Sequence, residues 1–407
     1  MEYKVSEVVK IISGGTPKRK NAEYWNGEIP WLSVKDFNNN NRLVHETEEQ
    51  ITEAGLNNSA ATLVSKGTVV ISARGTVGEL CQVAKSMTFN QSCFGLEAIS
   101  KYTTNEYIYY WFKYKTNYIK SNTHGSVFDT INRKTFENLY INLPNISYQK
   151  QVVNILKTLD NKIEINQNII TNLQELSQTL FKRWFVDFEF PDENGNPYRS
   201  SGGEMVDSEL GEIPKEWSIQ TLNDISESYN TKRKPLSKLE REKVASIYPY
   251  YGATKIIDYV DDYLFDGKFI LVGEDGTVQT EEGHPFVQYV WGKFWVSNHA
   301  HILKGNNLSD EILMLILNNI NIEPYITGAV QPKISKKNLN GIKVIIGTKL
   351  IYEKFDQYSD IYYKKIREIR EETKNLIELR DTLLPKLMSG ELEIPDDIEV
   401  NEDELSI

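Results

Sequence analysis

The chain of 407 residues repeats itself once, almost end to end, with an offset of 203 residues. At this offset Gly125–Pro144 aligns with Gly328–Gly347, and Asn172–Leu176 aligns with Asn375–Leu379. Two matched stretches with one shared offset indicate a duplicated unit. Two copies of one unit are expected to fold alike, and a chain built in this way usually acts on a target with two-fold character, of which duplex DNA is the commonest.

Composition favours a cytoplasmic protein of two or more domains. No uncharged apolar run is long enough to span a membrane, and the first ten residues lack the apolar stretch of a secretory signal. The chain has only two cysteines, Cys81 and Cys93, which fits reduced thiols.

The net charge of -11 is concentrated in two segments. Residues 191–212 carry a charge of -5 and residues 391–407 carry a charge of -8, so the rest of the chain sums to +2. Each acidic segment follows the end of a repeat unit, which predicts a linker and a tail. The net charge therefore does not exclude nucleic-acid binding by the folded parts.

Each unit divides into two unlike parts. The first parts, residues 1–145 and 213–347, contain short β-prone runs separated by glycine and asparagine, together with helical stretches such as 105–119 and 309–320. The β-prone runs include Thr68–Ala73, Lys268–Val272, Phe286–Trp291 and Ile342–Ile346. This pattern predicts two globular domains of the α+β class, with mixed strands and helices.

The second parts, residues 146–190 and 348–390, each predict one long helix with an apolar stripe at coiled-coil spacing. In the first helix the stripe comprises Val152, Leu156, Leu159, Ile163, Ile170, Leu173, Leu180 and Trp184, and polar Asn166 and Ser177 interrupt it. In the second it comprises Phe355, Tyr362, Ile366, Ile369, Leu376, Leu383 and Leu387. Neither helix can bury its stripe alone, so we expect the two helices, each about 50 Å long, to pack as an antiparallel coiled coil.

Basic clusters recur at matching places in the two units. Residues 16–20 and 231–235 each hold three adjacent cations beside a proline, a composition that suits a loop along phosphates, although a lone basic triplet is more often a solvated surface loop. The pairs at 133–134 and 336–337 also match. The candidate DNA-binding residues are Lys18, Arg19, Lys20, Arg74, Arg133, Lys134, Lys232, Arg233, Lys234, Lys333, Lys336 and Lys337.

Glycine turns follow two of the β-prone runs, at residues 72–78 and 274–278. Arg74 in the first could bind a guanine edge, and Glu274 or Asp275 in the second could accept from a cytosine amine; a structural β-turn is an equal alternative. His299 and His301 lie two apart on a strand, but no third ligand accompanies them. We therefore expect no metal site there and favour hydrogen bonding within the fold or to DNA.

No catalytic motif accompanies these features. The sequence has no phosphate-binding loop, no methyltransferase glycine loop with an Asn-Pro-Pro-aromatic motif and no helicase Walker pair. Asp266, Lys268 and Glu274 are in the wrong order for a nuclease cluster. These absences predict a chain that is not an enzyme and holds no cofactor.

Several motifs in their order along the chain resemble the specificity (S) subunit of type I restriction–modification systems. The most specific are Leu180–Phe188 (LFKRWFVDF), which closes the first helix, and Gly211–Trp217 (GEIPKEW), which opens the second domain. Further matches are Ile12–Pro17 (ISGGTP), Ile29–Leu32 (IPWL) and Leu383–Leu392 (LLPKLMSGEL). The resemblance covers essentially the whole chain.

The resemblance implies two target-recognition domains, each of which reads one half of a bipartite, asymmetric DNA site. The partners it implies are double-stranded DNA, two methyltransferase (M) subunits, which bind S-adenosylmethionine, and restriction (R) subunits, which use ATP. The helices would act as a spacer between the domains and as a dock for M subunits. The candidate partner-binding residues are Trp184, Phe185, Leu387 and Met388.

Two alternatives stay open at this point. The chain could be the recognition subunit of a related system in which one partner polypeptide both methylates and cleaves. It could also be a coiled-coil scaffold for protein interactions with no role in DNA binding.

Overall fold

A computed structural model describes residues 1–37, 41–122, 131–328 and 330–395 of the chain. Gly125 and Val127 of the internal repeat, and most of the acidic tail predicted at 391–407, lie outside the described residues. None of the helices described is long and apolar enough to cross a membrane.

The chain forms two compact units, which we call unit 1 and unit 2. Unit 1 comprises residues 1–168 and 369–407, so it is assembled from both ends of the chain. Unit 2 comprises the continuous segment 169–368. Each unit contains one domain of strands and short helices, together with parts of two long helices.

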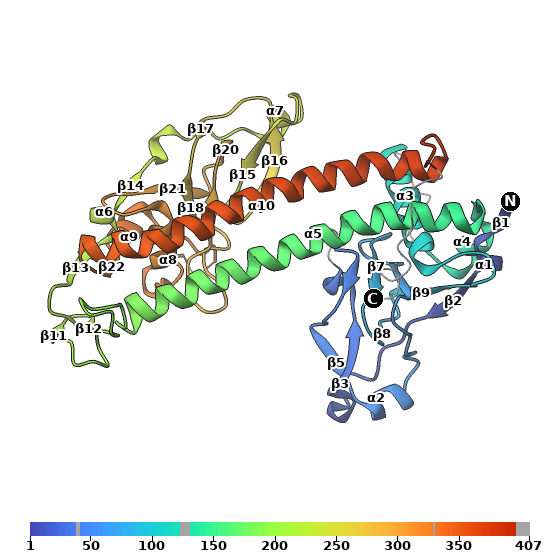
Figure 1. The fold of residues 1–407 in the computed structure, drawn as a ribbon, viewed down its shortest axis with the longest axis horizontal. Helices are drawn as coiled ribbons and strands as arrows, with labels where there is room; N and C mark the ends of the chain where they lie inside the picture. Colours follow the sequence, from blue (N-terminus) through green and yellow to red (C-terminus); the bar gives the residue numbers. More distant parts are fainter. Residues whose placement is uncertain (38–40, 123–130, 329, 396–407) are drawn as a thin grey trace. The chain divides into compact units, whose positions relative to one another are not determined.

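The domain of unit 1 contains three small sheets (Figure 1). The largest has the order β2-β9-β6-β7-β4, the second has the order β5-β3-β8, and β1 pairs with β10. The strands are β1 (Glu2–Lys4), β2 (Val9–Ser13), β3 (Trp25–Leu32), β4 (Leu43–Val44), β5 (Glu49–Ile51), β6 (Val69–Ser72), β7 (Leu80–Val83), β8 (Thr88–Phe89), β9 (Cys93–Ala98) and β10 (Tyr140–Asn142). Every residue of β6 is buried, which explains its continuous β-branched run at the centre of the sheet.

The domain of unit 2 has the same plan. Its two larger sheets have the orders β14-β21-β18-β19 and β16-β15-β20-β17, and β13 pairs with β22. The strands are β13 (Ser218–Thr221), β14 (Ser226–Ser228), β15 (Tyr248–Tyr251), β16 (Ile256–Val260), β17 (Phe265–Asp266), β18 (Phe269–Gly273), β19 (Val287–Val290), β20 (Lys293–Val296), β21 (Ala300–Gly305) and β22 (Lys343–Ile346).

Further helices complete both domains, and all but the second of each unit stand at matching places in strand order; the second follows β5 in unit 1 but precedes β15 in unit 2. In unit 1 they are α1 (Val5–Val8), α2 (Glu53–Asn57), α3 (Asn105–Asn122) and α4 (Arg133–Asn138). In unit 2 they are α6 (Leu222–Ile225), α7 (Lys238–Arg241), α8 (Asp310–Leu317) and α9 (Lys336–Asn340).

The two domains share most of their strand pairing. The first strand of each pairs antiparallel with the last, in β1–β10 and in β13–β22. In the second sheet of each, one strand pair is antiparallel and the next is parallel, in β5-β3-β8 and in β16-β15-β20. Only β4 and β17 have no counterpart in these sheets. The predicted tandem repeat of two mixed α/β domains is therefore confirmed.

The long helices are α5 (Ile146–Phe181) and α10 (Lys349–Ser389). The side chain of Asn145 accepts a hydrogen bond from the Tyr148 backbone amide at 2.8 Å and so caps the start of α5. After α10, Gly390 has a positive φ of 78°, the conformation that commonly ends a helix. The predicted stripe of α5 is only partly covered, since Val152, Leu156, Ile163 and Trp184 are buried and the other apolar members are half-buried.

Within each unit the two long helices run antiparallel, as predicted. In unit 1, Tyr148 bonds to the Leu387 carbonyl at 3.1 Å, whereas Asn166, later in α5, bonds to Thr373, earlier in α10. In unit 2 the same reversal holds for aromatic contacts. Phe181 lies 5.9 Å from Phe355 between ring centroids, and Phe185 lies 5.1 Å from Tyr352.

The segment predicted as an acidic linker, 191–212, is ordered. After α5 the chain makes a π-helical turn (Lys182–Val186) and then a hairpin of β11 (Met205–Ser208) and β12 (Gly211–Pro214) (Figure 1). Trp217 anchors this segment, because Phe190 stacks on its ring at 5.1 Å and Phe188 packs edge-on at 5.3 Å. The acidic segment is thus held to unit 2 through aromatic side chains.

Candidate nucleic-acid interface

Three loops meet at the same place in each domain, and we call this the three-loop face. In unit 1 they are the basic loop after β2 (14–20), the turn after β6 (73–78) and the loop between β8 and β9 (90–92). The amide of Ala73 donates to the Ser92 carbonyl at 2.7 Å, and the amide of Gly15 donates to the Phe89 carbonyl at 2.9 Å.

The three-loop face of unit 2 is built by the equivalent loops, at 230–235, 274–278 and 297–299. Here the amide of Glu274 donates to the His299 carbonyl at 2.8 Å, in the position of the Ala73–Ser92 bond of unit 1. The segment before the next short helix joins both faces. Ile131 donates to Ala73 at 3.2 Å, and Ile334 donates to Glu274 at 2.9 Å. The structure thus brings the matching basic loops and glycine turns together.

The basic loop of unit 1 divides its cations between two roles. Arg19 forms a two-bond ion pair with Glu49, one bond being 2.8 Å, and its guanidinium lies 3.9 Å from the ring centroid of Trp25. The hydrogen bond from Arg19 holds the pKa of the Glu49 carboxyl below its usual value. Lys18 and Lys20, on either side, are exposed. Arg19 therefore fixes the loop, while its neighbours are placed to meet an anion.

The basic loop of unit 2 has the same division with a more buried centre. Arg233 donates to Glu274 at 2.7 Å and to the carbonyls of Asn298 and Ala300 at 3.1 Å and 2.9 Å. Its side chain is only 17% exposed, against 55% for Arg19. Lys232 and Lys234 are exposed on either side. In both loops the central arginine binds the protein itself, which sequence inspection did not foresee.

Glu274 is the hub of the face in unit 2. Besides Arg233 it pairs with Lys333 at 3.3 Å, and it lies 3.7 Å from the ring of His301. Burial would raise the pKa of the Glu274 carboxyl, but these cationic partners outweigh it and lower the pKa below its usual value. Glu274 is thus an ionised carboxylate committed to internal contacts, which argues against the expectation that it accepts from a cytosine.

The two histidines take different roles. His301 is buried, with Nδ1 2.8 Å from the Asn230 side chain and Nε2 2.9 Å from the Ile334 carbonyl, and burial lowers its pKa. His299 is half-exposed and pairs with Asp275 at 2.6 Å. Within the described parts of the chain, no three metal-ligating side chains gather at one point. Hydrogen bonding within the fold accounts for His301.

The remaining candidate cations lie at the rim of the faces. Arg74 is exposed on the turn of unit 1, where Gly75 has a positive φ of 77° that permits the tight geometry. Arg133 donates to the Ile11 carbonyl at 3.0 Å, whereas Lys134 beside it is exposed. In unit 2, Lys336 and Lys337 are both exposed at the start of α9.

Comparison with known proteins gives this face its context. A family model described as the type I restriction modification DNA specificity domain matches residues 1–175 and again 214–375, and so covers most of the chain. The chain belongs to this family. It is a specificity subunit of a type I restriction–modification system, as the resemblance in its motifs implied.

Individual relatives agree over nearly the full length of the specificity subunit. The type I restriction enzyme MjaIX specificity subunit of Methanocaldococcus jannaschii is 26% identical over 413 residues, which is 96% of this chain and 93% of the relative. The EcoprrI specificity subunit of Escherichia coli is 22% identical over 84% of this chain and 82% of its own. The crystal structure of the S subunit from M. genitalium shares the fold, with a TM-score of 0.57, 17% identity and 95% coverage of both chains.

The residues expected to bind partners lie inside the specificity subunit's own core. Trp184, Phe185 and Leu387 are at most 7% exposed, and Met388 is half-buried. Phe185 packs between Tyr352 and Trp217. That these four residues contact a partner stays a prediction, and their burial means that they would support such a surface from beneath.

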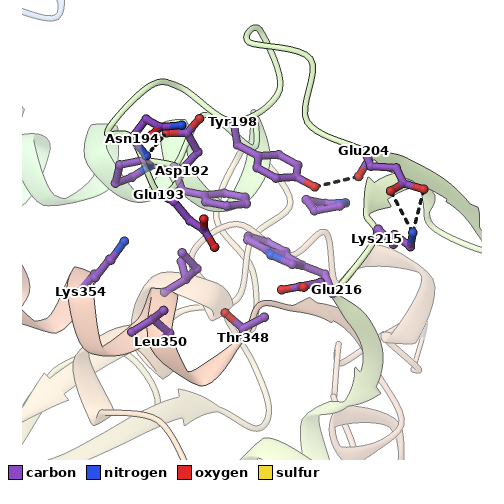
Figure 2. A pocket seen from close by; sticks show the side chains of 15 residues that line it. Asp192, Glu193, Asn194, Tyr198, Glu204, Lys215, Glu216, Thr348, Leu350 and Lys354 are labelled. Carbon is purple, nitrogen blue, oxygen red and sulfur yellow. Dashed lines mark hydrogen bonds and ion pairs between the residues drawn. The ribbon is translucent and has the colours of Figure 1, made fainter.

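A pocket of about 540 Å³ lies beside the aromatic anchor of unit 2. Figure 2 shows Tyr198 over the pocket and Glu204 paired with Lys215 at its edge. Acidic Asp192, Glu193 and Glu216 line it, with Lys354 as an opposing charge. An acidic lining repels phosphate, so this pocket does not extend the candidate nucleic-acid interface.

Proposed function

We propose that this specificity subunit recognises a bipartite, asymmetric DNA sequence, one half with each three-loop face. The observation that carries the proposal is that one scaffold holds different chemistry at its matching loops. Where unit 1 has Ala73, unit 2 has Glu274, and where unit 1 has Ser92, unit 2 has His299. Equal scaffolds with unequal loops fit a site whose two halves differ in sequence.

In this proposal the exposed cations hold the phosphate backbone. Those whose side chains are exposed and adjacent to the three-loop faces are Lys18, Lys20, Arg74, Lys134, Lys232, Lys234, Lys336 and Lys337. Arg19, Arg133, Arg233 and Lys333 contribute by shaping the loops, because each binds another part of its own unit. Base reading then falls to the other groups between the cations, such as Asp275 and His299 of unit 2, because Glu274 is committed to Arg233 and Lys333.

The long helices serve as the spacer in this proposal. The 36 residues of α5 span about 54 Å at about 1.5 Å per residue. At about 3.4 Å per base pair, this length corresponds to roughly 16 base pairs. The antiparallel pairing of α5 with α10 gives the subunit two similar helical surfaces, on which two methyltransferase subunits would dock.

In this proposal the subunit acts in the cytoplasm. It would carry out no catalysis itself. Methyl transfer from S-adenosylmethionine would belong to the methyltransferase subunits, and ATP-dependent cleavage to restriction subunits that join them. The names of the relatives support this division, since each is a specificity subunit of a type I restriction enzyme.

The test is selection of bound DNA from a pool of random duplexes by the subunit together with its methyltransferase partner. The proposal expects two constant half-sequences separated by a fixed number of variable positions, and binding that weakens steeply with salt. Selection of one continuous sequence, or of no sequence, would contradict it. Exchange of residues 14–92 for those of another specificity subunit should change one half-sequence and leave the other unchanged.

A further inference from the structure

A chain of buried polar groups crosses the helix pair of unit 1. Asp160 of α5 accepts a hydrogen bond from Tyr110 of α3 at 2.7 Å and one from Arg380 of α10 at 2.8 Å. The side chains of Asp160 and Arg380 are only 2% and 4% exposed. One carboxylate thus joins the globular domain to both long helices.

A second polar layer lies further along the same seam. The Asn166 amide of α5 donates to Thr373 at 3.2 Å and to Glu372 at 2.9 Å, both in α10. Asn166 is 1% exposed, and among the described residues its carbonyl oxygen has no hydrogen-bond partner. We call Tyr110, Asp160, Arg380, Asn166 and Thr373 the polar lock.

Buried polar layers of this kind select one register of a helix pair. Apolar residues tolerate many alignments, whereas a buried charge is stable only opposite its partner. A slip of α10 by one heptad would place Asp160 near Leu387 in one direction, or near Thr373 in the other. Either slip separates Asp160 from Arg380 and takes the arginine away from the buried carboxylate, whereas Arg380 itself keeps its contact with Asp381 at 2.9 Å.

The corresponding positions of unit 2 carry no charge. At the repeat offset Asp160 corresponds to Tyr363 and Arg380 corresponds to Ser177. Unit 2 instead joins its domain to α10 through Glu311, which pairs with Lys268 at 2.8 Å and with Arg367 at 3.1 Å. That cluster contains no residue of α5. A charged tie between α5 and α10 is therefore a feature of unit 1.

The domain of unit 1 makes two further side-chain contacts with α5, close to Asp160 in the sequence. Arg42 donates to Asn161 at 3.3 Å, and His45 lies 2.6 Å from Glu164. Asn161 and Glu164 follow Asp160 within about one turn of α5. The orientation of the domain and the register of α10 are thus set on the same stretch of α5.

We infer that the polar lock determines which spacer length the subunit accepts, without touching a base. It fixes α10 against α5 in one register and holds the recognition domain of unit 1 to that register. This inference rests on the proposed function, because it assigns the lock to the distance between two half-sequences. The lock residues act as positioning residues.

The decisive variant replaces the charged tie by apolar groups of similar size: Tyr110→Phe, Asp160→Leu and Arg380→Met together. Replacement of a complete buried ion pair in this way usually preserves folding. The matched control is Arg199→Gln with Glu212→Gln, which removes an exposed ion pair outside the long helices. Each protein, with its methyltransferase partner, selects from random duplexes about 40 base pairs long, enough for both halves and the spacer.

We expect the wild type and the control to select two half-sequences at one spacing. The apolar variant should select the same half-sequences, with the share of other spacings increased by about tenfold, a modest change in relative affinity. A folded apolar variant that keeps a single spacing would overturn the inference. If the wild type selects no two-part sequence, the proposed function fails, and register must be measured directly.

Cross-linking provides that direct measurement. Lys162 and Glu372 face each other at 3.4 Å, so Lys162→Cys with Glu372→Cys reports the native register. Lys162→Cys with Leu379→Cys reports a slip of one heptad. Burial raises the pKa of both native cysteines, Cys81 and Cys93, so they stay unreactive. The lock predicts that the second cross-link forms only in the apolar variant; native cross-linking alone in that variant would refute it.

Discussion

Units 1 and 2 place an arginine at the same point of the same loop and use it differently. In unit 1, Arg19 lies at the surface between Glu49 and the ring of Trp25. In unit 2, Arg233 turns inward onto Glu274 and two backbone carbonyls. The strand order is shared, but the partners of the cation are not. A shared scaffold can therefore hold loops whose internal contacts differ, while the lysines beside the arginine stay exposed in both.

The two units also bury charge in different settings. The Asp160–Arg380 pair of unit 1 is almost fully enclosed, whereas Glu311 of unit 2 is fully buried but its partners Lys268 and Arg367 are 37% and 23% exposed. Partners that reach water can be rehydrated when the central carboxylate is removed. The buried charge of unit 1 should therefore be less tolerant of mutation.

The largest expected effect tests this difference. Arg380→Ala should lower the free energy of unfolding by about 3–5 kcal/mol, because it leaves Asp160 as an unpaired buried carboxylate. Glu311→Gln should cost only about 1–3 kcal/mol, since the cations that remain are partly solvated. Urea denaturation of the full chain measures both, and equal losses would remove the distinction between the units.

The next effect concerns DNA binding. Replacement of Lys18 and Lys20 by alanine should weaken binding to all sequences and reduce the salt slope by about one for each phosphate that the variant no longer neutralises. Lys232→Ala with Lys234→Ala should do the same, because the two loops are equivalent. Titrations at several salt concentrations measure the slopes. A change in base preference without a change in slope would instead make these residues direct readers.

A smaller effect should be equal in the two units. Gly75 and Gly276 have φ values of 77° and 78°, and an added Cβ would meet no atom within 4 Å at either position. Gly75→Ala and Gly276→Ala should therefore each cost about 1 kcal/mol through backbone strain alone. Unequal losses of unfolding free energy would contradict this expectation. They would show that the backbone of one turn adjusts to the added Cβ and that of the other does not.

The smallest expected effect is a pH dependence that comes from His301 of unit 2. Burial lowers the pKa of His301, so the unfolded chain takes up a proton at a higher pH than the folded unit. Stability should thus decrease as the pH falls below the usual histidine value of about 6.5. His301→Gln should reduce that dependence in unfolding measured across this range.

Sequence periodicity predicted much of this architecture. The repeat, the long helices and their direction follow from local spacing, and Thr68–Ala73 and Phe286–Trp291 contain the strands β6 and β19. The pairing of Arg19 with Glu49 joins residues 30 positions apart, which no local pattern records. No local pattern records the pairing of Arg380 with Asp160 either, because these residues are 220 positions apart. A charged residue in line with an apolar stripe was nevertheless a signal that it needs a buried partner.

Composition did not show which aromatic residues of these segments are packed inside the molecule. The segment 191–212 is acidic, yet Phe190 and Tyr198 stack at 4.6 Å and tie it to unit 2. Trp184 and Phe185 stood out as aromatic residues in a distinctive motif, but they fill the core. Sequence patterns show which residues are unusual, and only the tertiary structure shows whether they face inward or outward.

The pairing of the first and last strands of each domain has an evolutionary consequence. Because β1 pairs with β10, and β13 pairs with β22, the first and last strands of each domain lie side by side. Genetic exchange of the segment between these two strands would leave the strand pair itself unchanged. Recombination between related genes can therefore replace one half of the reading surface at a single step, and inherit the rest of the molecule unaltered.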